Sequence, residues 1–216
     1  MIRLIRENSS FFIGFGIYLL GGLGLLIVLD KGDLLLWLNA YHTPIGDYFF
    51  RYYTFVGDGI FNLLIAALLF FFHWRKALAT VLSFAAVGLL VQLLKRLVFY
   101  ATPRPKTFFG DRESLHFVEG VSIHAYQSFP SGHSATAFSV FCLLTFFVKD
   151  KRWGAFFFIA ALLAALSRMY LLQHFLIDVY FGALLGVLIS SLIYYYLGKE
   201  PTSAIPPLPP QSKISC

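Results

Sequence analysis

Long apolar segments are the sequence feature that most constrains how this chain can fold. A helix that crosses a lipid bilayer needs about 20 mostly apolar residues. Six segments are candidates for such helices: residues 11–29, 55–72, 77–94, 135–148, 153–167 and 179–197. With 58% hydrophobic and 13% charged residues, the chain is too apolar for a soluble domain of 216 residues. The sequence therefore predicts an all-α, polytopic membrane protein, built as a bundle of six transmembrane helices.

A mixed segment follows the first apolar run. Residues 34–53 combine apolar residues with Asn39, His42, Pro44 and Asp47, and they end in an aromatic cluster. Aromatic side chains with a polar edge are enriched at the level of the lipid headgroups. We therefore expect this segment to lie on the membrane surface after the first helix.

The composition indicates one domain and a tail. Residues 1–198 contain no internal repeat and are expected to form the six-helix domain, whose first apolar run is too long for the core of a removable signal peptide. Residues 199–216 hold a cluster of prolines, which lack the N–H that a regular helix requires. We predict a flexible tail there that the chemistry does not need.

Basic residues near the predicted helices indicate how the protein is oriented. Counting six crossings puts one set on the same side: Arg3, Arg6, Arg75, Lys76, Lys149, Lys151, Arg152 and Lys199. Loops rich in Lys and Arg face the cytoplasm, so both termini are predicted there, in a bacterial inner membrane. The net charge of +6 forms no stripe on a polar domain, which argues against nucleic acid and favours anionic headgroups or phosphorylated substrates.

Three polar constellations lie on the opposite predicted side, facing the periplasm or the extracellular space. They are, in order, residues 95–105, with Lys95 and Arg104; residues 129–134, with Ser131, Gly132 and His133; and residues 167–178, with Arg168, His174 and Asp178. Ionisable groups clustered at membrane depth are costly, so their presence indicates a functional site.

The chemistry of these residues suits phosphoryl transfer. The cations Lys95, Arg104 and Arg168 supply positive charge, and Arg can bind phosphate oxygens through two parallel hydrogen bonds. Residues 131–132 at the start of a helix present backbone N–H groups to an anion. Two simpler interpretations remain open. A cation at a helix end can extend to the lipid headgroups, and Ser131 can be a helix cap with no other role.

His174 and Asp178 stand four positions apart, which on a helix places them on one face. An Asp that is hydrogen-bonded to one imidazole nitrogen leaves the other nitrogen free to attack, so His174 is the candidate nucleophile. His133 is the candidate acid that protonates the leaving alkoxide. The alternative is a structural His174–Asp178 pair that stabilises a short loop.

The three constellations resemble the signature of the type 2 phosphatidic acid phosphatase superfamily, Lys-x6-Arg-Pro, Pro-Ser-Gly-His and Ser-Arg-x5-His-x3-Asp. The last two motifs match residue for residue. The resemblance implies a membrane lipid phosphate phosphatase, similar to undecaprenyl-diphosphatases and phosphatidylglycerophosphatases, in which His174 forms a phosphohistidine that water hydrolyses. It also implies that His133 is the acid and that Asp178 orients His174. The implied phosphate-binding residues are Lys95, Arg104, Ser131, Gly132 and Arg168.

The first motif departs from the spacing of the family. Leu97 stands where the family has its lysine, whereas eight residues separate Lys95 from Arg104 and seven separate Arg96 from it. Because Lys95 and Arg96 leave a helix about 100° apart, only one of them can face the site. We expect Lys95 to do so, with Arg96 as the alternative.

The leading hypothesis is hydrolysis of a lipid phosphate monoester or diphosphate, such as phosphatidate, phosphatidylglycerol phosphate, polyprenyl diphosphate or lipid A phosphate. A lipid phosphotransferase that uses the same phosphohistidine, and a non-enzymatic transporter or scaffold, are the alternatives. We expect no metal and no other cofactor, since side chains supply the cations and the two cysteines indicate no thiolate site. The expected partners are the lipid substrate and the bilayer, and the sequence favours no oligomeric state.

Overall fold

The protein is built from helices in the part of the chain that the computed structural model describes, residues 1–111 and 114–198. The α-helices are α1 (Ile2–Glu7), α2 (Ser9–Val28), α3 (Asp33–Ala40), α4 (Pro44–Tyr53), α5 (Gly59–Phe72), α6 (Trp74–Leu93), α7 (Pro105–Phe109), α8 (Gly132–Phe147), α9 (Trp153–Tyr170) and α10 (Leu176–Ile193). A 3-10 turn, η1 (Thr54–Gly57), follows α4, and π-helical turns η2 (Leu94–Val98) and η3 (Tyr194–Gly198) follow α6 and α10. The predicted all-α class is confirmed. The tail predicted for residues 199–216 lies outside the described residues.

Four helices are long and apolar enough to cross a membrane on their own. They are α2, α6 continued by η2, α9, and α10 continued to Leu197. A fifth crossing results if Pro44–Gly57 and Gly59–Phe72, which meet at a bend of 57°, form one span. The apolar helix α8 has 16 residues and falls short of the required length. The protein is thus a multi-pass membrane protein, and the count of six crossings stays a prediction.

The segment expected on the membrane surface forms two short helices, α3 and α4. Thr43 caps α4 by accepting the Gly46 N–H at 3.1 Å. One side of α4 packs on α9, where the Tyr53 hydroxyl donates to the carbonyl oxygen of Ala160 at 3.1 Å. The opposite side leaves Ile45 and Tyr48 exposed. This amphipathic helix is compatible with an interfacial position, which stays a prediction.

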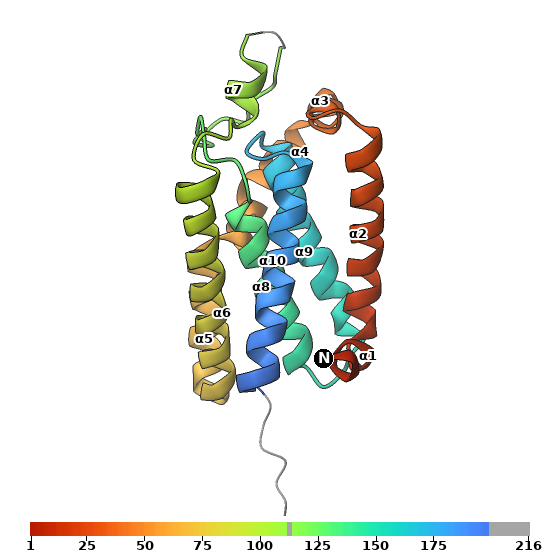
Figure 1. Ribbon diagram of the computed structural model, residues 1–216, viewed down its shortest axis with the longest axis vertical. Helices are drawn as coiled ribbons and strands as arrows, with labels where there is room; N and C mark the ends of the chain where they lie inside the picture. The colour runs from red at the N-terminus through yellow and green to blue at the C-terminus, as the bar shows by residue number, and fades with distance from the viewer. Residues whose placement is uncertain (112–113, 199–216) are drawn as a thin grey trace, which may run out of the picture.

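Helix α8 is the centre of the bundle, and α5, α6, α9 and α10 pack around it (Figure 1). Most of its side chains are buried, as is typical of a helix that is apolar on every side. Some of its polar positions find partners on neighbouring helices. The hydroxyl of Ser139, for example, lies 2.7 Å from that of Ser83 on α6. Short buried hydroxyl side chains therefore join these two helices.

Two glycines of α10 permit its close contact with α8. A Cβ at Gly182 would lie 2.5 Å from the carbonyl oxygen of Ser131, and one at Gly186 would overlap the carbonyl oxygen of Ala135. Small residues at such positions allow two helix backbones to approach. The contact brings the start of α8 against the start of α10, where two of the three sequence motifs lie.

The basic turns gather at the opposite end of the bundle from these motifs. The N-terminus, the turn between α5 and α6 and the turn between α8 and α9 all lie at the lower end in Figure 1. Direct contacts join them: the Ser10 hydroxyl donates to the carbonyl oxygen of Lys151, and Lys76 Nζ donates to that of Phe147 at 3.5 Å. The cations used for the predicted orientation that belong to the described residues therefore lie at the same end of the bundle (Figure 1), whereas Lys199 lies outside the described residues.

We expect Gly186→Ala to destabilise the protein, because the added methyl group meets backbone atoms that cannot rotate away. Overpacking of this kind costs about 1–3 kcal/mol. Thermal unfolding of the purified protein in detergent measures the effect. The matched control is Gly24→Ala on α2, where an added Cβ meets no atom within 4 Å. Equal unfolding midpoints for the two variants would contradict the role of Gly186 in the α8–α10 contact.

Candidate active site

A cavity of about 330 Å³ lies at the end of the bundle where α6 and α9 end and α8 and α10 begin. All three sequence motifs contribute to its lining, through Lys95, Arg104, Gly132, His133, Arg168 and His174. The other two predicted site residues, Ser131 and Asp178, lie behind this wall and are almost fully buried. The structure thus brings together residues that are up to 83 positions apart in sequence, from Lys95 to Asp178.

Lys95 faces the cavity from the π-helical turn η2 at the end of α6. A π turn holds one residue more than an α turn and is frequent at functional sites. Eight residues separate Lys95 from Arg104, two more than in the family motif, and the π turn accommodates one of these two. The Lys95 side chain is 6% exposed and its Nζ donates to the carbonyl oxygen of Gln127 at 2.6 Å, whereas Arg96 is exposed. Of the two alternatives left open by the sequence, Lys95 is the one that reaches the site.

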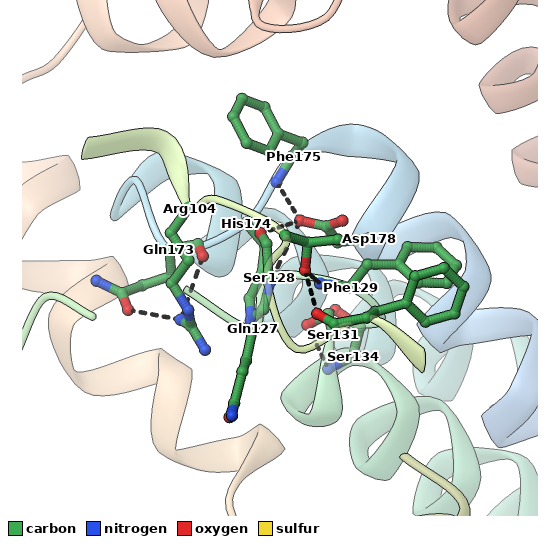
Figure 2. A network of polar contacts seen from close by, with 12 residues as sticks. Arg104, Gln127, Ser128, Phe129, Ser131, Ser134, Gln173, His174, Phe175 and Asp178 are labelled. Atoms are coloured by element: carbon green, nitrogen blue, oxygen red, sulfur yellow. Dashed lines mark hydrogen bonds and ion pairs between the residues drawn. The ribbon is translucent and has the colours of Figure 1, made fainter. Parts of the chain in front are cut away.

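Arg104 is held by the loop that follows it and by the segment before α10. Its Nε donates to the carbonyl oxygen of Tyr126 at 3.0 Å. Its Nη1 donates to the carbonyl oxygen and the side-chain oxygen of Gln173 at 3.3 and 3.2 Å (Figure 2). Arg168 on α9 donates from Nη1 to the Thr54 hydroxyl at 2.7 Å. Its buried Nε has no hydrogen-bond partner in the described part of the chain.

The positive charge of the cavity is not neutralised by salt bridges. In residues 1–111 and 114–198, none of the three cations lies within 4.0 Å of a carboxylate oxygen. Their partners are carbonyl, amide and hydroxyl oxygens, which orient the cations without cancelling their charge. Buried cations arranged in this way favour a multiply charged anion such as phosphate.

The Pro-Ser-Gly-His segment starts α8 at the cavity. The Ser131 hydroxyl caps the helix by accepting from the Ser134 N–H at 3.3 Å and from the Ser134 hydroxyl at 2.9 Å. The Ser131 N–H donates to the carbonyl oxygen of Asp178 at 2.9 Å, which ties this segment to α10. The hydroxyl of Ser131 therefore has the capping geometry, while Gly132 and His133 present the helix start to the cavity. Phosphate binding by Ser131 stays a prediction.

His174 and Asp178 are neighbours, but they do not share a helix face as expected from their spacing. His174 lies in the turn before α10, and Asp178 lies in the first turn of that helix. The chain bends back so that His174 Nδ1 is 3.4 Å from Asp178 Oδ2, an ion-pair distance without hydrogen-bond geometry (Figure 2). The same oxygen accepts the Phe175 N–H at 2.9 Å and the Ser128 hydroxyl at 2.5 Å. Asp178 is thus fixed from two sides beside the imidazole.

Burial decides the charge of the His174 imidazole. Removal from water lowers the pKa of His174 from 6.5 to about 3, although Asp178 acts in the opposite direction, and the nearby charges of Arg104 and Arg168 lower it further. The imidazole is therefore neutral at physiological pH. Only the neutral ring has a lone pair with which to attack.

Three residues near the cavity were not singled out by the motifs. Ser128 binds Asp178 and Gln173 binds Arg104, both while buried, and His124 lies at the cavity edge. Partial burial and the positive charges of the cavity, from Arg104 first, lower the pKa of His124. For Gln173 the sequence offers one signal, which is that a polar side chain stands directly before His174. Ser128 and His124 lie in a long loop whose path the sequence does not reveal.

Comparison with known proteins identifies the family. The model of the PAP2 superfamily matches residues 76–201, which is more than half of the chain. The chain belongs to the PAP2 superfamily. The resemblance drawn from the motifs is thereby confirmed, and the protein is a phosphoric ester hydrolase of this family.

Relatives of this PAP2 protein share its sequence and fold. A lipid A 4'-phosphatase from Bacteroides thetaiotaomicron is 30% identical over 178 residues, which are 77% of this chain and 76% of the relative. The crystal structure of Aquifex aeolicus LpxE matches with a TM-score of 0.68 and 28% identity, over 77% of this chain and 95% of that one. The crystal structure of a PAP2-type phosphatidylglycerolphosphate phosphatase from Bacillus subtilis matches with a TM-score of 0.66 and 23% identity, over 92% of this chain and 99% of that one. This match shows that the two proteins share a fold.

We expect Lys95→Gln to lower kcat/KM of this PAP2 hydrolase by roughly 10- to 100-fold. The reason is that a hydrogen bond to a charged group contributes about 1.5–3 kcal/mol, and 1.4 kcal/mol corresponds to a factor of ten. Arg96→Gln, the matched control one residue away, should stay within about twofold. Phosphate release by the two purified variants measures both values. A larger loss for Arg96→Gln than for Lys95→Gln would assign the role to Arg96.

The low pKa of His174 predicts that its ring stays neutral at pH 5, because protonation would place a cation in a buried site beside two arginines. A free imidazole is half protonated near pH 6.5. NMR of the protein with 13C-labelled histidine, assigned by comparison with His174→Gln, reports the protonation directly. A resonance of His174 that titrates between pH 6 and 7 would contradict the structure.

Proposed function

We propose that the protein hydrolyses the phosphate of a membrane lipid, a monoester or a diphosphate, through a phosphohistidine at His174. This proposal rests on one observation, namely which groups face the cavity at the end of the apolar bundle. A neutral imidazole, three cations that form no salt bridge with any described residue, and the start of α8 all face the same space. A phosphate bound there can meet donors and nucleophile together.

In the first step, Nε2 of His174 attacks phosphorus. For this step the ring must carry its hydrogen on Nδ1, which points to Asp178 Oδ2 at 3.4 Å. Catalytic hydrogen bonds are often long in a free enzyme and tighten once substrate is bound. The new N–P bond forms as the bond from phosphorus to the leaving oxygen breaks. Asp178 stabilises the positive charge that the ring gains.

The leaving oxygen needs a proton, and His133 is the residue proposed to give it. The ring must be protonated for this step, and the negative charge of the bound phosphate, whose monoanion can deliver the proton, favours that form. His133 lies in the first turn of α8 and lines the same cavity as His174. After the alcohol departs, neutral His133 can accept a proton from water, whose oxygen then attacks the phosphohistidine. Phosphate leaves and both imidazoles return to their first state. The cations and the N–H groups of α8 hold the phosphoryl oxygens throughout.

The relatives support a lipid as the substrate. The curated relative is a lipid A 4'-phosphatase, and the solved structures include LpxE and a phosphatidylglycerolphosphate phosphatase. The position of the cavity at a bundle end also favours a molecule whose phosphate lies at the membrane surface and whose chains stay in the bilayer. The basic turns at the other end support a cytoplasmic location for that end and a periplasmic or extracellular site.

His174→Ala should lower phosphate release at least about a thousandfold, because the proposed covalent intermediate forms on the His174 imidazole, which alanine lacks. The assay uses purified protein in detergent with a panel of lipid monophosphates and diphosphates. His73→Ala, at the opposite end of the bundle, is the matched control and should behave as wild type. A thermal unfolding midpoint equal to that of wild type verifies that the His174 variant is folded.

Two further readouts test the mechanism itself. Wild-type protein quenched during turnover should carry a phosphate that is labile to acid and stable to base, as a phosphohistidine is. Activity should persist in EDTA and fall with vanadate, which imitates five-coordinate phosphorus. Retained phosphate release by His174→Ala would eliminate the proposed nucleophile.

A further inference from the structure

A second cavity of about 260 Å³ adjoins the cavity of about 330 Å³ at the candidate active site, which we call the phosphate cavity. Four residues line both cavities: Val91, Gln92, Gly132 and His133. The second cavity continues between the corner formed by residues 57–59 and the face of α6 that carries Phe84 and Gly88. We refer to it as the α5–α6 groove.

The groove leads from the active site along α6 toward the middle of the bundle. Its α6 positions, residues 84, 87, 88, 91 and 92, recur at helical spacing and lie on the same side as Lys95. From Lys95 to Phe84 the helix rises about 16 Å, at roughly 1.5 Å per residue. A Cβ at Gly88 would meet no atom within 4 Å, so the missing side chain leaves space in the groove.

In the proposed function, the geometry of the attack on phosphorus connects this groove to the leaving group. In phosphoryl transfer the attacking and leaving atoms lie roughly in line through phosphorus. His174 lines the phosphate cavity and not the groove, whereas the proposed acid His133 lines both. Since the acid must stand beside the leaving oxygen, the leaving group extends from the phosphate past His133 and into the groove.

The charges of the two cavities differ. Lys95, Arg104 and Arg168 face the phosphate cavity. Among the described residues that line the groove, Asp58 is the only carboxylate and there is no Lys or Arg. Asp58 is held at the start of α5, where its Oδ1 accepts the Gly59 N–H at 2.6 Å. A carboxylate accepts hydrogen bonds from hydroxyl groups and repels a second phosphate.

We propose that the α5–α6 groove binds the alcohol part of the substrate and selects a neutral, hydroxyl-bearing alcohol, such as a glycerol or sugar unit that carries lipid chains. Attack by His174 breaks the bond between phosphorus and the alcohol oxygen, and the proton of His133 goes to that oxygen. A lipid diphosphate is disfavoured, because its leaving group is itself a phosphate and would meet Asp58. The hydrocarbon chains of the substrate, whether monoester or diphosphate, extend along α6 into the bilayer.

The first test fills the groove with Gly88→Leu. The probes are phosphatidate, which needs the groove, and p-nitrophenyl phosphate, whose small leaving group reaches only its entrance. We expect the ratio of kcat/KM for phosphatidate to kcat/KM for p-nitrophenyl phosphate to fall at least about tenfold. Gly24→Leu, at an equally open glycine on α2, should keep the wild-type ratio. An unchanged ratio in Gly88→Leu would overturn the assignment of the groove.

The second test removes the charge and keeps the helix cap with Asp58→Asn. Farnesyl phosphate and farnesyl diphosphate are the probes, because they differ only in the leaving group. Wild type should favour the monophosphate, and Asp58→Asn should raise relative activity on the diphosphate by about three- to tenfold. Asp150→Asn, an exposed carboxylate at the opposite end, is the control.

The outcomes separate this inference from the proposed function. A wild-type protein that releases phosphate, but prefers the diphosphate or keeps its preference in Asp58→Asn, would overturn the selection by the groove alone. A wild-type protein that releases no phosphate from any of these probes would overturn the proposed function together with the inference.

Discussion

The contact between α8 and α10 is the constraint on which the rest of the site depends. Gly182 and Gly186 let the two backbones approach until the Ser131 N–H reaches the carbonyl oxygen of Asp178 at 2.9 Å. Each helix begins at the cavity, so one contact sets the position of two motifs. The helix start that can bind phosphate and the histidine that can attack it are therefore fixed relative to each other by backbone atoms, which cannot change rotamer.

Charge burial explains why this end of the bundle is rich in backbone contacts from loops. Three buried cations would repel one another, and carboxylate partners would cancel the field that attracts a phosphate. Carbonyl oxygens of Gln127, Tyr126 and Gln173 satisfy Lys95 and Arg104 instead. The long loop between α7 and α8 is thus part of the site, because it supplies acceptors that carry no net charge.

The sequence predicted the helical class, the motifs and the residues that meet at the cavity, since apolar periodicity and motif order survive any local irregularity. It did not predict local geometry. The π turn at Lys95 depends on packing at the end of α6, and His174 reaches Asp178 through a bend before α10 and not along a helix face. The sequence does not predict the roles of Ser128 and Gln173, because these residues act through contacts that form only when the loops fold.

The corner between η1 and α5 extends the site beyond the part of the chain that matches the PAP2 family, which begins at residue 76. Thr54 binds the guanidinium of Arg168, and the carbonyl oxygen of Gly57 accepts the hydroxyl of Thr136 on α8. A Cβ at Gly57 would lie 2.8 Å from the carbonyl oxygen of His133, so only glycine lets the corner pack there. The shared motifs are the ones proposed to bind phosphate. A segment outside the match that contacts both Arg168 and His133 is therefore well placed to differ between relatives with different substrates.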